Sequence, residues 1–96
     1  MRVIWSTQSL NDLDAIYEYI AKDSPIYAQR VIERMISRGE QLVTFPKSGR
    51  KTPEMNRSDI REILEGSYRI IYHIKEDEIE ILTVLHGARL FPEHLF

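Results

Sequence analysis

The stretch "SYRIIYHIKEDEIEILTVLHGAR" (Ser67–Arg89) decides the fold of this chain. Two runs rich in β-branched and aromatic residues flank the polar pair Glu76–Asp77, and this pattern predicts two antiparallel strands joined by a tight turn. If Lys75 faces Glu78 across the turn, residues that oppose one another also share a face of the sheet. The stretch therefore predicts a hairpin and the direction of each of its side chains.

One face of the predicted hairpin is almost wholly apolar, and we expect it to lie beneath other elements. Its opposed pairs are Ile74 with Ile79, Tyr72 with Ile81, Ile70 with Thr83, and Tyr68 with Leu85. The other face is mixed and open to solvent or a ligand, with the pairs His73 with Glu80, Ile71 with Leu82, Arg69 with Val84, and Ser67 with His86. On this register Arg69 and His86 share the open face near one end of the strands, and Arg89 leaves the sheet at the same end.

Two amphipathic helices precede the hairpin, because apolar residues recur there at helical spacing. Gly39 lies inside the apolar stripe of the second helix, where we expect it to permit close approach of a neighbouring element or to mark a bend. The expected elements are a strand at Arg2–Trp5, a helix from Ser6 or Thr7 to about Lys22, and a helix that is capped by Ser24, starts at Pro25 and ends before Pro46.

The segment between positions 47 and 58 is predicted to be a loop, because Gly49 and Pro53 interrupt it. A further strand, Asp59–Leu64, is expected to lead into the hairpin. The element order is then β-α-α-β-β-β. The predicted fold class is α+β, with a helical hairpin packed on one face of a small, mostly antiparallel sheet, and residues 1–96 form a single domain.

The composition is that of a folded domain in a reducing compartment. Apolar residues make up 43% and charged residues 29% of the chain, which excludes a disordered protein. Cysteine is absent, so the sequence excludes disulfides and thiolate metal sites and is typical of a cytoplasmic protein. No apolar run reaches the roughly 20 residues of a membrane span. The net charge of −2 argues against a protein that coats nucleic acid.

Two groups of basic residues stand out against this acidic background. Between positions 47 and 61, the basic residues outnumber the acidic Glu54 and Asp59, and this segment is either a solvated loop or a docking surface for RNA, DNA or an acidic peptide. A second group repeats every fourth position along the second helix, as a solvated stripe or a partner-binding one. The groups are Lys47, Arg50, Lys51, Arg57 and Arg61, and Arg30, Arg34 and Arg38.

In these features the chain resembles the RelE/ParE superfamily of bacterial toxins from type II toxin–antitoxin modules. The resemblance covers nearly the whole chain and rests on "LNDLDAIYEYIA" (10–21), "FPKSGRKTPE" (45–54), the hairpin and the order of the elements. It implies a cytoplasmic toxin that is neutralised by a small antitoxin, ParD-like or RelB-like, encoded by an adjacent gene. It implies no cofactor and no metal.

The superfamily divides by target, since RelE-like members cut messenger RNA on the ribosome and ParE-like members bind and poison DNA gyrase. Metal-free RNA cleavage needs a base, an acid and cations around the phosphate. In a nuclease, Arg69 and Arg89 occupy positions that resemble two of the family's arginines, and His94 or His86 would have to substitute for a missing C-terminal tyrosine. Leu64 stands where RelE-like toxins carry an arginine. These departures favour the ParE-like branch, with mRNA cleavage and a non-toxic interaction domain as alternatives.

For a gyrase-binding toxin, the resemblance implies two contact surfaces. The target would meet the basic loop, the sheet arginines and the apolar end of the chain: Lys47, Arg50, Lys51, Arg61, Arg69, Arg89, Leu95 and Phe96. The antitoxin would meet the helical hairpin and the start of the tail: Arg30, Arg34, Arg38 and Phe91.

Overall fold

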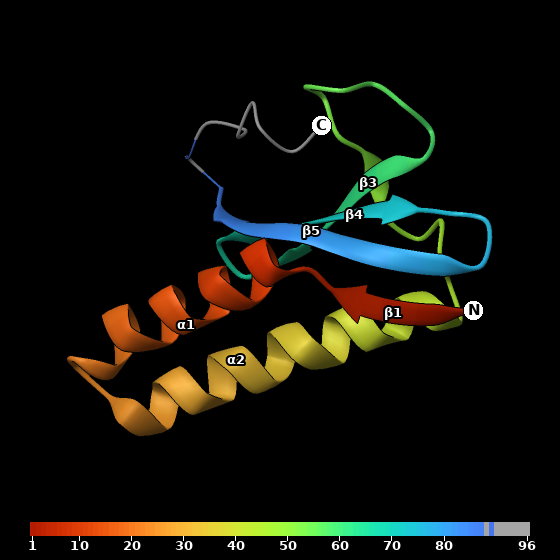
Figure 1. Cartoon of the computed structure of the whole chain (residues 1–96). Helices are drawn as coiled ribbons and strands as arrows, with labels where there is room; N and C mark the ends of the chain where they lie inside the picture. Colours follow the sequence, from red (N-terminus) through yellow and green to blue (C-terminus); the bar gives the residue numbers. More distant parts are fainter. Residues whose placement is uncertain (88, 90–96) are drawn as a thin grey trace.

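Figure 1 shows the computed structural model of the chain, which describes residues 1–87 and 89. In this part, two long helices lie side by side against one face of the sheet, as the sequence predicts, and the sheet has five strands, one more than predicted. The elements are β1 (Arg2–Trp5), α1 (Thr7–Ala21), α2 (Pro25–Glu40), the short 3-10 helix η1 (Gln41–Val43), β2 (Arg50–Lys51), β3 (Ile60–Glu65), β4 (Tyr68–Ile74) and β5 (Glu78–His86).

The sheet has the strand order β1-β5-β4-β3-β2. β1 runs parallel to β5, and the other neighbouring pairs are antiparallel. β2 corrects the prediction of a loop at 47–58, because Arg50 and Lys51 pair with Glu62 and Arg61 of β3. A strand of two charged residues carries no alternating apolar pattern, so the sequence gives no signal for it.

Both helices begin at the predicted serine caps. Ser6 Oγ accepts a hydrogen bond from the Ser9 backbone N–H at 3.0 Å, and Ser24 Oγ accepts one from the Tyr27 N–H at 3.2 Å. Each bond satisfies a backbone donor that the first turn of a helix leaves without a partner. Pro25, with its fixed φ, is the first residue of α2.

α2 passes very close to the sheet at Gly39. A Cβ atom on this residue would lie 2.5 Å from Trp5 Cζ2 and 2.8 Å from Ile81 Cδ1, closer than carbon atoms can approach. The helix continues through Gly39 to Glu40, so the glycine marks a close approach and not a bend. This confirms the first of the two interpretations from the sequence.

The main core lies between the helices and the sheet. Burying these apolar side chains contributes roughly 25 cal/mol per Å² removed from water and is the chief source of stability. The buried members of the core are Leu13, Val31, Met35, Leu42, Ile63, Ile70, Tyr72, Ile79, Ile81 and Val84.

Neither helix of the described chain is long and apolar enough to cross a membrane.

The predicted hairpin register is right near the turn and wrong beyond it. Ile74–Ile79, His73–Glu80 and Tyr72–Ile81 pair as predicted. The register then shifts by one, because β5 holds an extra residue at a β-bulge. The later pairs are Ile71–Thr83, Ile70–Val84, Arg69–Leu85 and Tyr68–His86, and they replace the predicted Ile71–Leu82, Ile70–Thr83, Arg69–Val84, Tyr68–Leu85 and Ser67–His86.

The start of α1 stabilises the bulge. Ser6 Oγ donates to the Leu82 carbonyl at 2.9 Å, and Asp12 Oδ2 accepts from the Val84 N–H at 2.9 Å and from the Thr83 hydroxyl. β1 ends at Trp5, so the N-cap Ser6 and Asp12 of α1 satisfy polar groups of β5 that have no strand beside them. Because of the bulge, His86 shares the helical face with Val84.

Candidate functional site

The sheet face opposite the helices, here called the open face, is partly covered by the chain's own loop. Four apolar residues form a second cluster on it, and Met55 from the loop between β2 and β3 packs against them. Thr52 of the same loop is completely buried, and its hydroxyl has no partner in the described structure. The cluster consists of Ile60, Ile71, Leu82 and Leu85.

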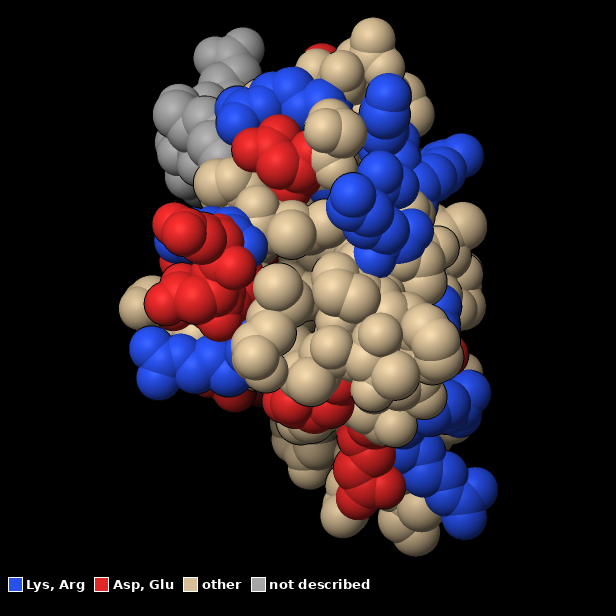
Figure 2. Space-filling view, turned by 90° about the vertical axis from the view of Figure 1, so that its right-hand side faces the viewer, with Lys and Arg blue, Asp and Glu red and all other residues tan. Residues whose placement is uncertain are grey.

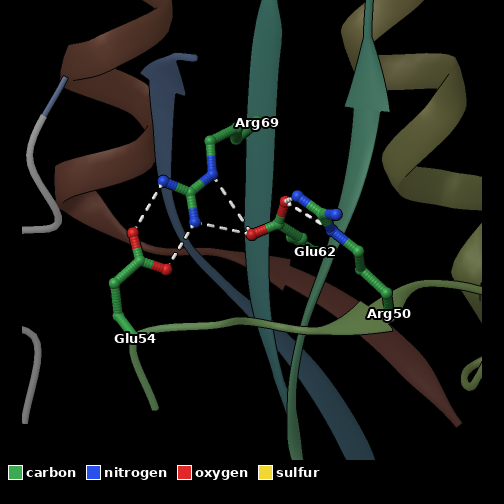
Figure 3. Close-up of polar contacts among 4 residues, drawn as sticks. All are labelled: Arg50, Glu54, Glu62 and Arg69. Carbon is green, nitrogen blue, oxygen red and sulfur yellow. Dashed lines mark hydrogen bonds and ion pairs between the residues drawn. The ribbon is translucent and has the colours of Figure 1, made fainter. Parts of the chain in front are cut away.

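Arg69 lies at the centre of a four-residue ion-pair network on the open face (Figure 3). Its Nη1 and Nη2 donate to the two carboxylate oxygens of Glu54, at 2.9 and 2.7 Å. Its Nε and Nη2 donate to Glu62 Oε1, at 3.1 and 2.6 Å. The second oxygen of Glu62 accepts from Nε and Nη2 of Arg50, at 3.1 and 2.9 Å. The network thus ties β2 and its following loop to β3 and β4.

The four members are buried to different degrees, and the pKa shifts follow their pairing. The Glu62 side chain is fully buried and that of Arg69 is 9% exposed, whereas Glu54 is 36% exposed. Hydrogen bonds from Arg69 hold the pKa of Glu54 below its usual value, and bonds to Glu54 and Glu62 raise the pKa of Arg69. A phosphate that approached the Arg69 guanidinium here would have to displace a carboxylate.

The Tyr72 hydroxyl fixes the loop at positions 46–49. It donates to the Pro46 carbonyl at 2.7 Å and accepts from the Gly49 N–H at 3.1 Å, while Arg61 Nη1 donates to the Gly49 carbonyl at 2.8 Å. Burial raises the pKa of Tyr72, so it remains a neutral donor. A Cβ on Gly49 would lie 2.4 Å from the Glu62 carbonyl oxygen, so only glycine fits there.

The basic segment separates into paired and unpaired charges. Arg50 is bound to Glu62, and Arg57 is bound to Asp59 at 2.7 Å. The remaining three are here called the basic surface, because none of them has a carboxylate partner within residues 1–87 and 89: Lys47, Lys51 and Arg61. Figure 2 shows that the Lys and Arg side chains gather along the upper and right-hand parts of one side of the molecule.

His86 lies away from Arg69, on the helical side of the sheet. Its ring meets that of Tyr68 edge to face, with centroids 5.6 Å apart. The two rings line a groove of about 460 Å³ whose other residues include Tyr19 of α1 and Arg89. Arg69 neighbours Leu85 and points to the opposite face. The prediction that Arg69 and His86 share a face is therefore wrong, and the bulge is the reason.

The arginines of α2 also differ from one another. Arg38 Nη2 donates to the Leu64 carbonyl at 3.2 Å, and Arg38 Nε lies 3.7 Å from Glu65, so this side chain joins α2 to the end of β3. Arg30 and Arg34 are exposed. The remaining predicted site residues, Phe91, His94, Leu95 and Phe96, lie outside the described residues.

Sequence reasoning missed the two carboxylates that hold Arg69. Ile60, Glu62 and Leu64 are two residues apart along β3 and therefore share one face of the sheet. Leu64 pairs with Arg69, so correct pairing of β3 and β4 would have placed Glu62 on the same face as Arg69. Glu54 comes from a loop whose path no local pattern predicts. Within the described residues, no three His, Asp or Glu side chains gather as metal ligands.

The fold and these surfaces define a domain of the RelE/ParE type. A solved structure of the chromosomal ParDE toxin–antitoxin system of P. aeruginosa is similar, with a TM-score of 0.73 and 25% identity over 88% of this chain and 92% of that one. A structure of the RelBE2 toxin–antitoxin complex of Mycobacterium tuberculosis shares the fold, with a TM-score of 0.66 and 20% identity over 92% of each chain.

Sequence relatives agree with the fold. The family model described as ParE toxin of type II toxin–antitoxin system, parDE, matches residues 3–91. The putative toxin Y4kP of Sinorhizobium fredii is 37% identical over 98% of this chain and 96% of its own length. Toxin RelE2 of Caulobacter vibrioides is 32% identical over 93% of this chain and 98% of its own. The chain belongs to the ParE toxin family of type II toxin–antitoxin systems.

Proposed function

We propose that this toxin stops growth by binding DNA gyrase, with no catalytic residue of its own, and that a cognate antitoxin holds it inactive. Membership of the ParE family supports the proposal, since ParE-like toxins poison gyrase. In this mode the work of the toxin is recognition, so its functional residues are those that touch the target.

The observation that carries the proposal is the state of the residues that a nuclease would need. A cation that stabilises a charged phosphorus intermediate must reach the phosphate, and an acid or base must reach the same phosphate from nearby. Arg69 is bound to Glu54 and Glu62, and His86 lies on the other face of the sheet. The two side chains cannot act on one phosphate without a rearrangement of β5, which favours a binding-type toxin.

Ribosome-dependent mRNA cleavage is the second candidate. The name of the relative RelE2 favours it, as does the basic surface, whose charges can meet RNA phosphates. In that mode Arg89, on the chain just past β5, would be the sheet-end cation. A non-toxic interaction domain on the same fold is the third reading.

One comparison separates the two toxic activities. The chain is induced without an antitoxin, and plasmid supercoiling and transcript cleavage are measured in the same cells. Loss of supercoiling with intact transcripts is the expected result, together with inhibition of purified gyrase by the purified chain. Cleaved transcripts with normal supercoiling would sink the gyrase proposal and establish the nuclease. Growth that continues unchanged, with neither effect, would leave the non-toxic domain as the answer.

The antitoxin is proposed to cover the helical hairpin. Two solved neighbours come from toxin–antitoxin systems, ParDE and RelBE2, and Arg30 and Arg34 give α2 an exposed basic stripe on which an acidic antitoxin segment can lie. Co-expression with the adjacent reading frame should yield a stable complex that Arg30→Glu and Arg34→Glu weaken. Capture that both substitutions leave unchanged would place the antitoxin elsewhere.

A further inference from the structure

A shallow, mostly apolar hollow is lined by Met1, by residues 44–48 and by Ile74, and Lys47 of the basic surface is part of this lining. Its volume is about 470 Å³, within the range of sites that accept a ligand group of substantial size. Figure 2 shows uncharged surface in the middle of one side of the molecule, with mostly basic side chains above and to the right of it and both acidic and basic ones to the left and below. The hollow is lined by Met1, Thr44, Phe45, Pro46, Lys47, Ser48 and Ile74.

Phe45 is a largely exposed aromatic residue whose backbone is held by hydrogen bonds on both sides. The residue is 65% exposed. Its N–H donates to the Gln41 carbonyl at 3.2 Å, and its carbonyl accepts from the Ser48 N–H at 3.1 Å. The next residue, Pro46, is held by the buried hydroxyl of Tyr72. An aromatic side chain displayed on a backbone that is fixed in advance loses little entropy when it binds, which is typical of an interface anchor.

The charges around the hollow select the kind of partner. The basic surface contributes three positive charges that have no carboxylate partner in the described part of the chain, whereas the whole chain has a net charge of −2. Lys47 is itself part of the lining. The acidic side chains on the other border would repel a continuous phosphate backbone, and an apolar floor offers nucleic acid nothing to pair with. An apolar side chain flanked by carboxylates meets both features.

We infer that this hollow is the surface by which the toxin binds its protein target. An apolar or aromatic side chain from an acidic segment of the target packs on Phe45, and Lys47, Lys51 and Arg61 pair with the carboxylates beside that side chain. The inference rests on the proposed function, in which the target is the protein gyrase. It places target binding at the end of the molecule opposite the turn between α1 and α2 (Figure 1), so the helical hairpin remains for the antitoxin.

The test uses the full chain against purified gyrase in a DNA supercoiling assay. Phe45→Ser removes the anchor, and the double variant Lys47→Glu/Lys51→Glu reverses two charges that have no carboxylate partner within residues 1–87 and 89. The matched controls are Ile26→Ser, which changes another well-exposed apolar residue (70%), and Lys22→Glu. Both controls lie by the turn between α1 and α2. Circular dichroism and urea midpoints check that all four variants fold.

The inference predicts that each surface variant loses about tenfold or more in inhibitory potency, as expected for an interface anchor, while the controls match the parent. Raised salt should weaken the parent more than the charge-reversed variant. If the parent inhibits gyrase and both surface variants inhibit it equally well, the hollow is not the docking site and the proposed function stands. If the parent does not inhibit gyrase, both the proposed function and this inference are wrong.

Discussion

The two faces of the sheet are buried by different means. On the helical face, apolar side chains of α1 and α2 pack on those of β3, β4 and β5. On the open face, a loop folds over a small apolar cluster and is fastened by alternating charges, with Glu62 between Arg50 and Arg69. Apolar packing tolerates changes of shape within limits, whereas a buried ion network depends on each member, since any deletion leaves an unpaired charge.

This difference suggests a division of roles. The helical face holds the domain together. The open-face network and the Tyr72 hydroxyl set the path of residues 46–54, and that path determines where Phe45 and the basic surface point. The following changes test this contrast, from the largest expected effect to the smallest.

Replacing Glu62 by alanine should be the most damaging of these changes. It leaves the 9%-exposed Arg69 with the more exposed Glu54 alone, and breaking a buried pair costs about 3–5 kcal/mol of the free energy of unfolding. Urea denaturation measures the loss. The double variant Glu62→Leu/Arg69→Met removes both charges and should lose much less than the single variant. A double variant as unstable as Glu62→Ala would show that the network owes nothing to charge pairing.

On the helical face, Asp12→Ala tests the bulge. The carboxylate accepts from the Val84 N–H and the Thr83 hydroxyl, and hydrogen bonds to a charged group contribute about 1.5–3 kcal/mol. Amide hydrogen exchange at Val84 should accelerate, and the urea midpoint should fall. The control is Asp14→Ala, at an exposed position of the same helix, which should leave both unchanged. Slow exchange at Val84 in Asp12→Ala would mean that the bulge is held by other contacts.

Tyr72→Phe removes the side-chain hydroxyl and should reduce the potency against gyrase while the domain stays folded. Each lost hydrogen bond costs roughly 0.5–1.5 kcal/mol, so the domain stays folded. Without the hydroxyl, the Pro46 carbonyl and the Gly49 N–H lose their partner, so the loop at 46–49 becomes more mobile. The inhibitory potency against gyrase should therefore fall by more than the loss of stability explains. Tyr17→Phe, at a half-exposed residue of α1, serves as the control in the same two assays. Potency equal to that of the parent would contradict a positioning role for Tyr72.

The smallest effect is expected from Glu54→Gln, and it depends on pH. Because Arg69 lowers the pKa of Glu54 in the folded state, the pair stabilises the fold above the ordinary pKa of about 4.5. That stability disappears as the pH falls through the lower, folded-state pKa. The side chain is 36% exposed, so the contribution is under about 1 kcal/mol.

Urea midpoints measured between about pH 6 and pH 3 would reveal this contribution, because this range spans the ordinary pKa of the Glu54 carboxyl. Glu54→Gln should be less stable than the parent at pH 6 and should approach it at pH 3. Glu76→Gln, at an exposed turn residue, should follow the parent throughout. A constant gap between Glu54→Gln and the parent at all pH values would rule out the carboxylate charge as its cause.

Most of the fold could be predicted because its signals are local. Serine caps, Pro25, apolar periodicity and the polar turn at Glu76–Asp77 each act over a few residues, and each element that they predict is present. The candidate site could be predicted only in part. Lys47 and Lys51 were identified from local charge, but the pairing of Arg69 depends on Glu54 and Glu62, which meet it only after β2, β3 and β4 assemble.

By itself the sequence determined the order of the elements apart from β2, the helical hairpin, the apolar side of the strands near the turn and a basic loop. Only the tertiary structure decided which face His86 takes, because one extra residue in β5 is accommodated by Asp12 and Ser6 of a distant segment. Strand alternation has a period of two, so a single bulge reverses every side chain beyond it. The partners that stabilise such a bulge come from elsewhere in the chain, and no local pattern contains them.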